Sequence, residues 1–203
     1  MYKKLITIST LSLAVFATST SCYAAKRPSL HSRAETEMPI VQAVASNAKV
    51  IQAVQMSNQQ MAKATPKQLL QFERNWRAEL KSHKGAMLEK ITKSKLSQQL
   101  NRSLTATQNK LLNLIILNNK GIVIAASKPP QNYWQEHKAI WRKSFLGGAS
   151  ANYISRRSDI DKTTKQRYMA ASLPILNKEK KVIGVVAAKL NVKQLQTRSK
   201  KKA

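Results

Sequence analysis

Cysteine is almost absent from this chain of 203 residues, and Cys22 is the only one. A single thiol excludes a disulfide framework within the chain. Histidine is also scarce: His31, His83 and His137 lie far apart, with no paired spacing for a metal and no nearby pair of acids. No glycine-rich phosphate loop or nucleophile elbow occurs. We therefore expect no catalytic residues, no metal site and no bound cofactor.

Acidic residues are few as well. Nine Asp and Glu stand against 36 Lys and Arg, which gives a net charge of +27. Such a field attracts polyanions over a Debye length of about 8 Å at physiological salt. The basic residues are spread over most of the chain, and only Arg198 to Lys202 forms a block. A dispersed positive surface favours solubility over a binding site, so contact with an anionic surface is expected mainly through that tail.

Long hydrophobic runs are missing after the first 24 residues. Two lysines near the start precede an uncharged run from Leu5 to Ala17, and a segment of small and polar residues follows. This pattern predicts a signal peptide over residues 1–24, cleaved after Ala24, because Cys22 and Ala24 supply the small side chains that the peptidase needs. Cleavage would remove the only cysteine and place the product in the periplasm or outside the cell. An uncleaved membrane anchor stays an alternative, since this run is about long enough to cross a bilayer.

Helical periodicity dominates the first half of the remaining sequence. Residues 25–38 are polar and are expected to form a disordered leader. Apolar residues then recur at three- and four-residue steps from Pro39 to about Ala62, which predicts one amphipathic helix. The segment Thr65-Pro66-Lys67-Gln68 predicts the start of a second helix with Thr65 as its N-cap. A third helix is expected from Met87 to about Leu104.

The second half changes to short β-branched runs that are typical of strands. Five strands are expected, at residues 112–117, 122–126, 153–155, 168–175 and 182–190. The first two form a hairpin around a turn that ends in Gly121, and an amphipathic segment over 132–145 separates them from the rest. The order predicts a single α+β domain over 39–195, with long N-terminal helices before a roughly five-stranded antiparallel sheet. A basic disordered tail over 196–203 follows.

Several segments resemble the extracytoplasmic PAS-like sensor modules called PDC or Cache domains, in their small single-module form. Leu114 to Ser127 is similar to the central hairpin of that family, and Ser172 to Val186 resembles its closing hairpin. Asn75 to Leu80 fits the helical part of related members. Tyr133-Trp134-Gln135-Glu136, followed by Trp141, resembles a stretch that lies over the ligand-binding face. The resemblance implies a sensor that binds an anionic or zwitterionic metabolite over the sheet and acts through a partner protein of the cell envelope.

The candidate ligand-binding residues combine aromatic rings, which line pockets, with groups that could hold a carboxylate. They are Tyr133, Trp134, Trp141, Arg142, Arg156, Tyr168 and Ser172. The guanidinium groups of Arg142 and Arg156 can donate two parallel hydrogen bonds. Because Tyr133 and Trp134 are adjacent, at most one is expected to face the core, which leaves the other for a ligand. Trp141 also fits the core face of a short helix.

Two further interpretations stay open beside the sensor. In the first, the protein is a basic envelope or secreted protein that binds anionic polymers through its charge, with affinity that falls steeply as salt rises. In the second, it is a packing scaffold whose filled sheet face leaves no pocket. The amphipathic helix that starts at Pro39 could in addition pair with its copy in a homodimer.

Overall fold

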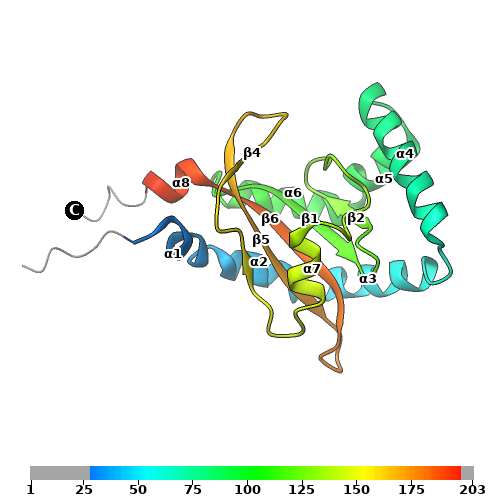
Figure 1. Ribbon diagram of the computed structural model, residues 1–203, viewed down its shortest axis with the longest axis horizontal. Coiled ribbons are helices and arrows are strands. Elements are labelled where there is room, and N and C mark those ends of the chain that lie inside the picture. The colour runs from blue at the N-terminus through cyan, green and yellow to red at the C-terminus, as the bar shows by residue number, and fades with distance from the viewer. Residues whose placement is uncertain (1–27, 198–203) are drawn as a thin grey trace, which may run out of the picture.

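The computed structural model describes residues 28–197, in which most of the helices precede a single antiparallel sheet (Figure 1). The predicted signal peptide over 1–24 and the block from Arg198 to Lys202 lie outside the described residues. The helices before the sheet are α1 Leu30–Glu35, α2 Met38–Ala45, α3 Ala48–Gln60, α4 Pro66–Ser82, α5 Ala86–Lys93 and α6 Lys95–Ala106. None of the described helices has the length and apolar character needed to cross a membrane.

Two of the predicted helices are each divided in two. The helix expected over 39–62 is interrupted at Asn47, whose extended backbone (φ −69°, ψ 125°) ends α2 and whose side chain accepts a hydrogen bond from the Lys49 N–H at 3.0 Å. The helix expected from Met87 to about Leu104 is interrupted at Ser94, between α5 and α6, where the Ser94 hydroxyl accepts a hydrogen bond from the Ser97 N–H at 3.1 Å. Asn and Ser compete with helical hydrogen bonds in this way, which apolar periodicity alone does not reveal.

The predicted start of α4 is confirmed. The Thr65 hydroxyl accepts from the Gln68 N–H at 3.3 Å, and the Gln68 side chain accepts from the Thr65 N–H at 2.8 Å, which completes the capping box. Leu69 and Trp76 are buried on its inner stripe. This helix therefore presents one apolar face to the rest of the domain.

The sheet confirms the α+β prediction and adds one short strand. Its strands are β1 Leu111–Asn118, β2 Val123–Ala126, β3 Tyr153–Ile154, β4 Asp159–Ile160, β5 Arg167–Leu176 and β6 Val182–Asn191. The order across the sheet is β2-β1-β6-β5-β3, and β4 pairs with β5. The long pairs β1–β6 and β5–β6 are antiparallel, which puts β6 at the centre of the sheet.

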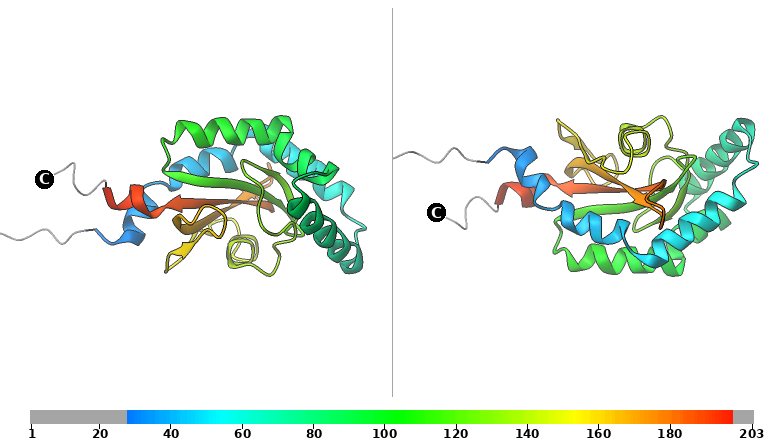
Figure 2. Two further views of the ribbon diagram at one scale, coloured as in Figure 1. Left: turned by 90° about the horizontal axis from the view of Figure 1, so that it is seen from above. Right: turned by 90° about the horizontal axis from the view of Figure 1, so that it is seen from below.

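Different helices cover the two faces of the sheet (Figure 2). On the first face, α2, α3 and α6 pack against alternate strand residues such as Ile116, Val186 and Leu190 to form the larger apolar core. On the second face, α7 Ala139–Phe145 packs against β5 and β6, while α4 and α5 lie across the end near β2. Strand alternation fixes which residues reach each face. The groups on the second face therefore lie on the opposite side of the sheet from α2, α3 and α6.

The chain ends of the described part lie side by side. Helix α1 packs against α8 Val192–Thr197, and the Arg33 guanidinium donates to the Leu195 carbonyl at 3.2 Å. The prediction of a disordered leader over 25–38 is wrong for residues 30–38, because α1 and the start of α2 are ordered around buried Ala34 and Met38. The predicted tail likewise begins later than residue 196, since α8 continues to Thr197.

Candidate functional site

Helix α7 closes the part of the second face that lies over the middle of β5 and β6. The Trp141 indole N–H donates to the Asn118 carbonyl at 3.1 Å, and the Trp141 ring stacks on Phe145 with 4.6 Å between ring centroids. The hydroxyls of Ser144 and Ser172 share a hydrogen bond of 2.8 Å between α7 and β5. Both serines are fully buried. Trp141 and Ser172 therefore help to pack α7 onto the sheet.

A buried carboxylate on α4 holds the segment that contains Tyr133 and Trp134. Glu73 is only 8% exposed and accepts hydrogen bonds from the Tyr133 N–H at 2.7 Å and the Trp134 N–H at 2.9 Å. The side chains of Asn132 and Arg77 donate to the same carboxylate at 2.8 and 2.7 Å. Burial works to raise the pKa of Glu73, but these donors outweigh it and hold the pKa below its usual value.

The two neighbouring aromatics divide as the sequence predicts. Tyr133 is buried against Phe72 and Trp76, with ring centroids 6.5 and 5.8 Å away, and burial raises its pKa to about 12. Trp134 is half-buried, and its indole N–H donates to the Lys120 carbonyl at 2.9 Å. Tyr133 thus belongs to the core that α4 covers, and Trp134 keeps part of its ring in solvent.

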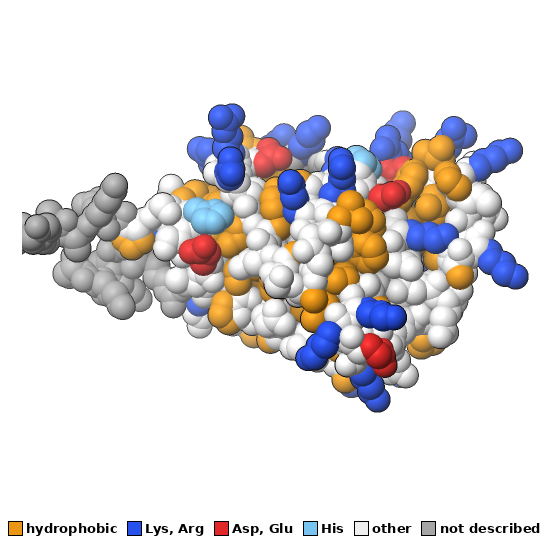
Figure 3. Space-filling model, turned by 60° about the horizontal axis from the view of Figure 1, so that its bottom comes forward, with side chains coloured by type: hydrophobic (Ala, Val, Ile, Leu, Met, Phe, Trp, Pro, Cys, Tyr) orange, Lys and Arg blue, Asp and Glu red, His pale blue; other side chains and the backbone are white. Residues whose placement is uncertain are grey.

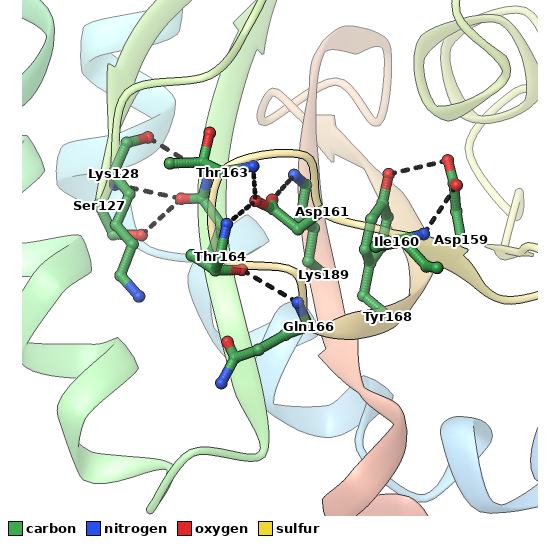
Figure 4. Close-up of polar contacts among 11 residues, drawn as sticks. Ser127, Lys128, Asp159, Ile160, Asp161, Thr163, Thr164, Gln166, Tyr168 and Lys189 are labelled. Atoms are coloured by element: carbon green, nitrogen blue, oxygen red, sulfur yellow. Dashed lines mark hydrogen bonds and ion pairs between the residues drawn. The ribbon is translucent and has the colours of Figure 1, made fainter.

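The charged group on the second face is an ion pair between Lys189 and Asp161 (Figure 4). Lys189 lies on central strand β6, directly opposite Asn113 of β1 and Ala170 of β5. Its ammonium binds the Asp161 carboxylate and stands 4.6 Å from the centroid of the Tyr168 ring. The two side chains are 28% and 15% exposed, so the pair is partly desolvated yet reachable from solvent.

The loop between β4 and β5 orients this carboxylate independently of the lysine. Backbone N–H groups of Thr163 and Thr164 donate to Asp161 Oδ1 at 3.0 and 2.9 Å, while Lys189 binds the other oxygen. Burial would raise the pKa of Asp161, but the hydrogen bond and charge of Lys189 and the two N–H groups lower it to about 2. The carboxylate is therefore ionised and held in place at neutral pH.

More polar groups flank the ion pair on both sides (Figure 4). On β1, the Asn113 side chain accepts from the Ser127 hydroxyl at 2.8 Å and from the Lys128 N–H at 3.1 Å. On β5, the Tyr168 hydroxyl donates to Asp159 at 3.3 Å. Burial and the nearby Asp159 carboxylate raise the pKa of Tyr168 to about 12. Polar side chains on β1 and β5 thus lie on either side of Lys189 on β6.

The structure brings together only some of the seven predicted site residues. Tyr168 and Ser172 share the second face of β5 because they are separated by an even number of residues. Trp141 lies on α7, whose Ser144 hydroxyl shares a hydrogen bond with Ser172, and Tyr133 and Trp134 form a separate group under α4. The remaining two, Arg142 on the outer side of α7 and Arg156 between β3 and β4, are exposed.

Sequence reasoning missed the residues that carry charge into the site. Lys189 had a visible signal, because it is the one charged residue in the otherwise apolar run from Val182 to Leu190. Asp161 had no such local signal, because its pairing with Lys189 across the sheet depends on the fold. Glu73 had no distinguishing signal among the polar residues of α4.

These features define an α+β fold in which α2, α3 and α6 cover one face of the sheet. The second face carries an apolar cluster under α7 and α4, and the Lys189–Asp161 ion pair. A family model described as Cache domain matches residues 39–202. The chain therefore belongs to the Cache domain family, whose members are ligand-binding sensory modules.

Among the solved structures similar to this chain, one supports the fold of this assignment. The sensor domain of E. coli DcuS has a TM-score of 0.51 and 14% identity, over 83% of this chain and 96% of that one. The sensor domain of the V. cholerae histidine kinase DctB has a TM-score of 0.48 and 13% identity, over 85% of this chain and 56% of that one. The ligand-binding domain of the Pseudomonas aeruginosa amino acid chemoreceptor PctC, solved with GABA, has a TM-score of 0.47 and 14% identity, over 82% of this chain and 57% of that one. The chain thus spans little more than half of the latter two domains. A search of curated proteins finds no match.

Proposed function

We propose that this protein is a periplasmic sensing module that binds a small anionic or zwitterionic metabolite on the second face of the sheet and acts through a partner protein. The proposal rests on one observation above all, the Lys189–Asp161 ion pair on the central strand. Family membership makes ligand binding the expected role. Relatives named for sensing and for GABA binding are consistent with a small ligand, without identifying it here.

The ion pair is suited to this role because it offers both signs of charge at one place. A carboxylate could replace Asp161 as the partner of Lys189, and an ammonium could replace Lys189 beside Asp161 and the Tyr168 ring. A zwitterion would replace both at once and leave no buried charge without a partner, which avoids the cost of breaking such a pair. Arg156 stays a candidate contact for the rest of the ligand, and ligand contact by Trp134, which lies in the separate group under α4, stays a prediction.

Movement of the β4–β5 loop is the proposed output. Asp161 begins this loop and carries its side of the ion pair, so a ligand that separates Asp161 from Lys189 would favour a different loop position. A ligand changes an equilibrium only by binding one conformation better than the other. We propose that an envelope partner, or a second copy docked through the N-terminal helices, reads this change.

Thermal shift measurements with amino acids and small dicarboxylates at millimolar concentration test the proposal. At least one compound should raise the melting temperature of the wild-type protein. The same compound should have a much smaller effect on Lys189→Met and Asp161→Asn, because each variant removes one side of the recognition. Lys93→Met is the matched control, since Lys93 forms an exposed ion pair with Glu89 on α5 at 2.7 Å. No stabilisation across the set, or equal stabilisation of all variants, would contradict the proposal.

A second candidate function is the binding of anionic polymers, favoured by the charge of the surface. Lys and Arg side chains project over much of the face in Figure 3, whereas Asp and Glu are few there. This function predicts retention on heparin that weakens steeply with salt and does not depend on Lys189. Small-ligand binding that persists at high salt favours the first proposal instead.

A further inference from the structure

The outer side of α7 lines a hollow that the proposed sensing function does not use. Its volume is about 500 Å³, and its lining residues are His137, Ala139, Arg142, Lys143, Leu146 and Gly147. Two of the six carry a permanent positive charge and none is acidic. All six are exposed, and Leu146 is 65% exposed, so the hollow is open to solvent.

Helical periodicity explains why these residues share one side. Ala139, Arg142, Lys143 and Leu146 are spaced by three and four residues and therefore form one stripe along the helix. Trp141 and Ser144 lie on the opposite stripe and attach the helix to the sheet through hydrogen bonds of 3.1 and 2.8 Å. The basic stripe is thus presented by a helix whose position is fixed from behind.

The chain turns tightly at Gly147, just after the C-terminal end of α7, where it lines the hollow. A Cβ atom at Gly147 would stand 2.3 Å from the Lys143 carbonyl oxygen, so only glycine permits the chain to turn so tightly after Phe145. Within residues 28–197, neither the Arg142 nor the Lys143 side chain takes part in an ion pair or side-chain hydrogen bond. Their positive charges are therefore not offset by partners in the described fold.

We propose that this hollow is a binding site for a phosphate group, separate from the ligand site at Lys189. Two permanent cations match the charge of about −1.5 to −2 that a phosphate monoester carries near pH 7, whereas a single carboxylate would leave one cation without a partner. The Arg142 guanidinium supplies the planar pair of donors that phosphate oxygens accept, and Lys143 adds a point charge. A volume of this size would leave room for an organic group attached to the phosphate.

Melting temperatures in sodium phosphate, compared with sodium chloride at equal ionic strength, test the site with inorganic phosphate as the probe. At ten times the dissociation constant, phosphate should raise the melting temperature of the wild-type protein by about 3 to 6 °C. The double variant Arg142→Gln/Lys143→Gln should lose this increase. The control Lys178→Gln/Lys181→Gln removes the same charge from two exposed residues at the β5–β6 turn and should keep it. Arg142→Lys should keep part of it.

Because both side chains are exposed, the double variant should melt close to the wild-type protein in sodium chloride, which separates loss of binding from loss of folding. An equal phosphate effect in the wild-type protein and both double variants would show that only diffuse charge acts, and would overturn the proposal. No phosphate effect on the wild-type protein would overturn it as well. Neither result bears on Lys189, so the sensing function is tested separately.

Discussion

Replacing Glu73 with alanine should destabilise the domain strongly, because the buried carboxylate accepts hydrogen bonds that have no substitute. The Tyr133 and Trp134 N–H groups donate to it at 2.7 and 2.9 Å, from a segment that α4 covers. A buried donor left without an acceptor costs about 1–3 kcal/mol, so the two together should lower the free energy of unfolding by about 2–6 kcal/mol. Asn132 and Arg77 would also lose a partner.

Urea denaturation at neutral pH measures this loss directly. Glu73→Gln should cost less than Glu73→Ala, since the amide oxygen can still accept from one or both N–H groups but carries no charge. Glu89→Ala serves as the control, because Glu89 has one exposed partner, Lys93, and should change the midpoint little. If the free energy of unfolding of Glu73→Ala lies within about 0.5 kcal/mol of the wild-type value, water replaces the carboxylate and Glu73 does not anchor residues 132–134.

Three other predictions concern the local structure. Thr65→Ala should lower the free energy of unfolding by about 0.5–2 kcal/mol through loss of the capping box, as measured by urea denaturation. Gly121→Ala should destabilise the protein more than Gly148→Ala, and thermal melts of the two variants test this order. Both glycines have positive φ, but at Gly121 a Cβ would also stand 2.5 Å from the backbone nitrogen of Glu136, whereas at Gly148 it would meet no atom within 4 Å. The pKa of Asp161 is lowered to about 2, so the contribution of its carboxylate to stability is full above about pH 4 and is lost as the pH falls through about 2. Over that range, the difference in free energy of unfolding between the wild-type protein and Asp161→Asn should shrink. Acid titrations followed by circular dichroism measure this difference.

Much of the fold could be predicted from the sequence, because its signals are local. The capping box at Thr65 and the hairpin around Gly121 depend on residues close together in the chain, and both are confirmed. The divisions of the helices at Asn47 and Ser94 were missed, because apolar periodicity continues through them while a single side chain changes the backbone. Helix α1 was missed because its order comes from packing against α8, at the other end of the described chain.

The candidate site was less predictable, because its geometry depends on contacts across the sheet. Tyr168 and Ser172 could be assigned to one face from strand alternation alone. The pairing of Lys189 with Asp161 joins residues 28 positions apart, and no local pattern announces it. Arg142 was expected to hold a carboxylate over the sheet, but the helical phase set by Trp141 and Ser144 turns it outward. Whether Arg142 and Arg156 bind a ligand stays a prediction.

Calorimetric titration of the compound that stabilises the protein most, into the wild-type protein, Lys189→Met and Lys93→Met, measures ligand recognition at the Lys189–Asp161 pair. The titrations should be run at about 0.1 M and about 1 M salt, between which the Debye length falls from about 10 to about 3 Å. We expect binding to the wild-type protein and Lys93→Met at both salt concentrations. The affinity of Lys189→Met should be at least tenfold weaker, which is the size of a lost charge-assisted hydrogen bond. Equal affinity for all three proteins, or binding that disappears at high salt, would contradict recognition at the Lys189–Asp161 pair.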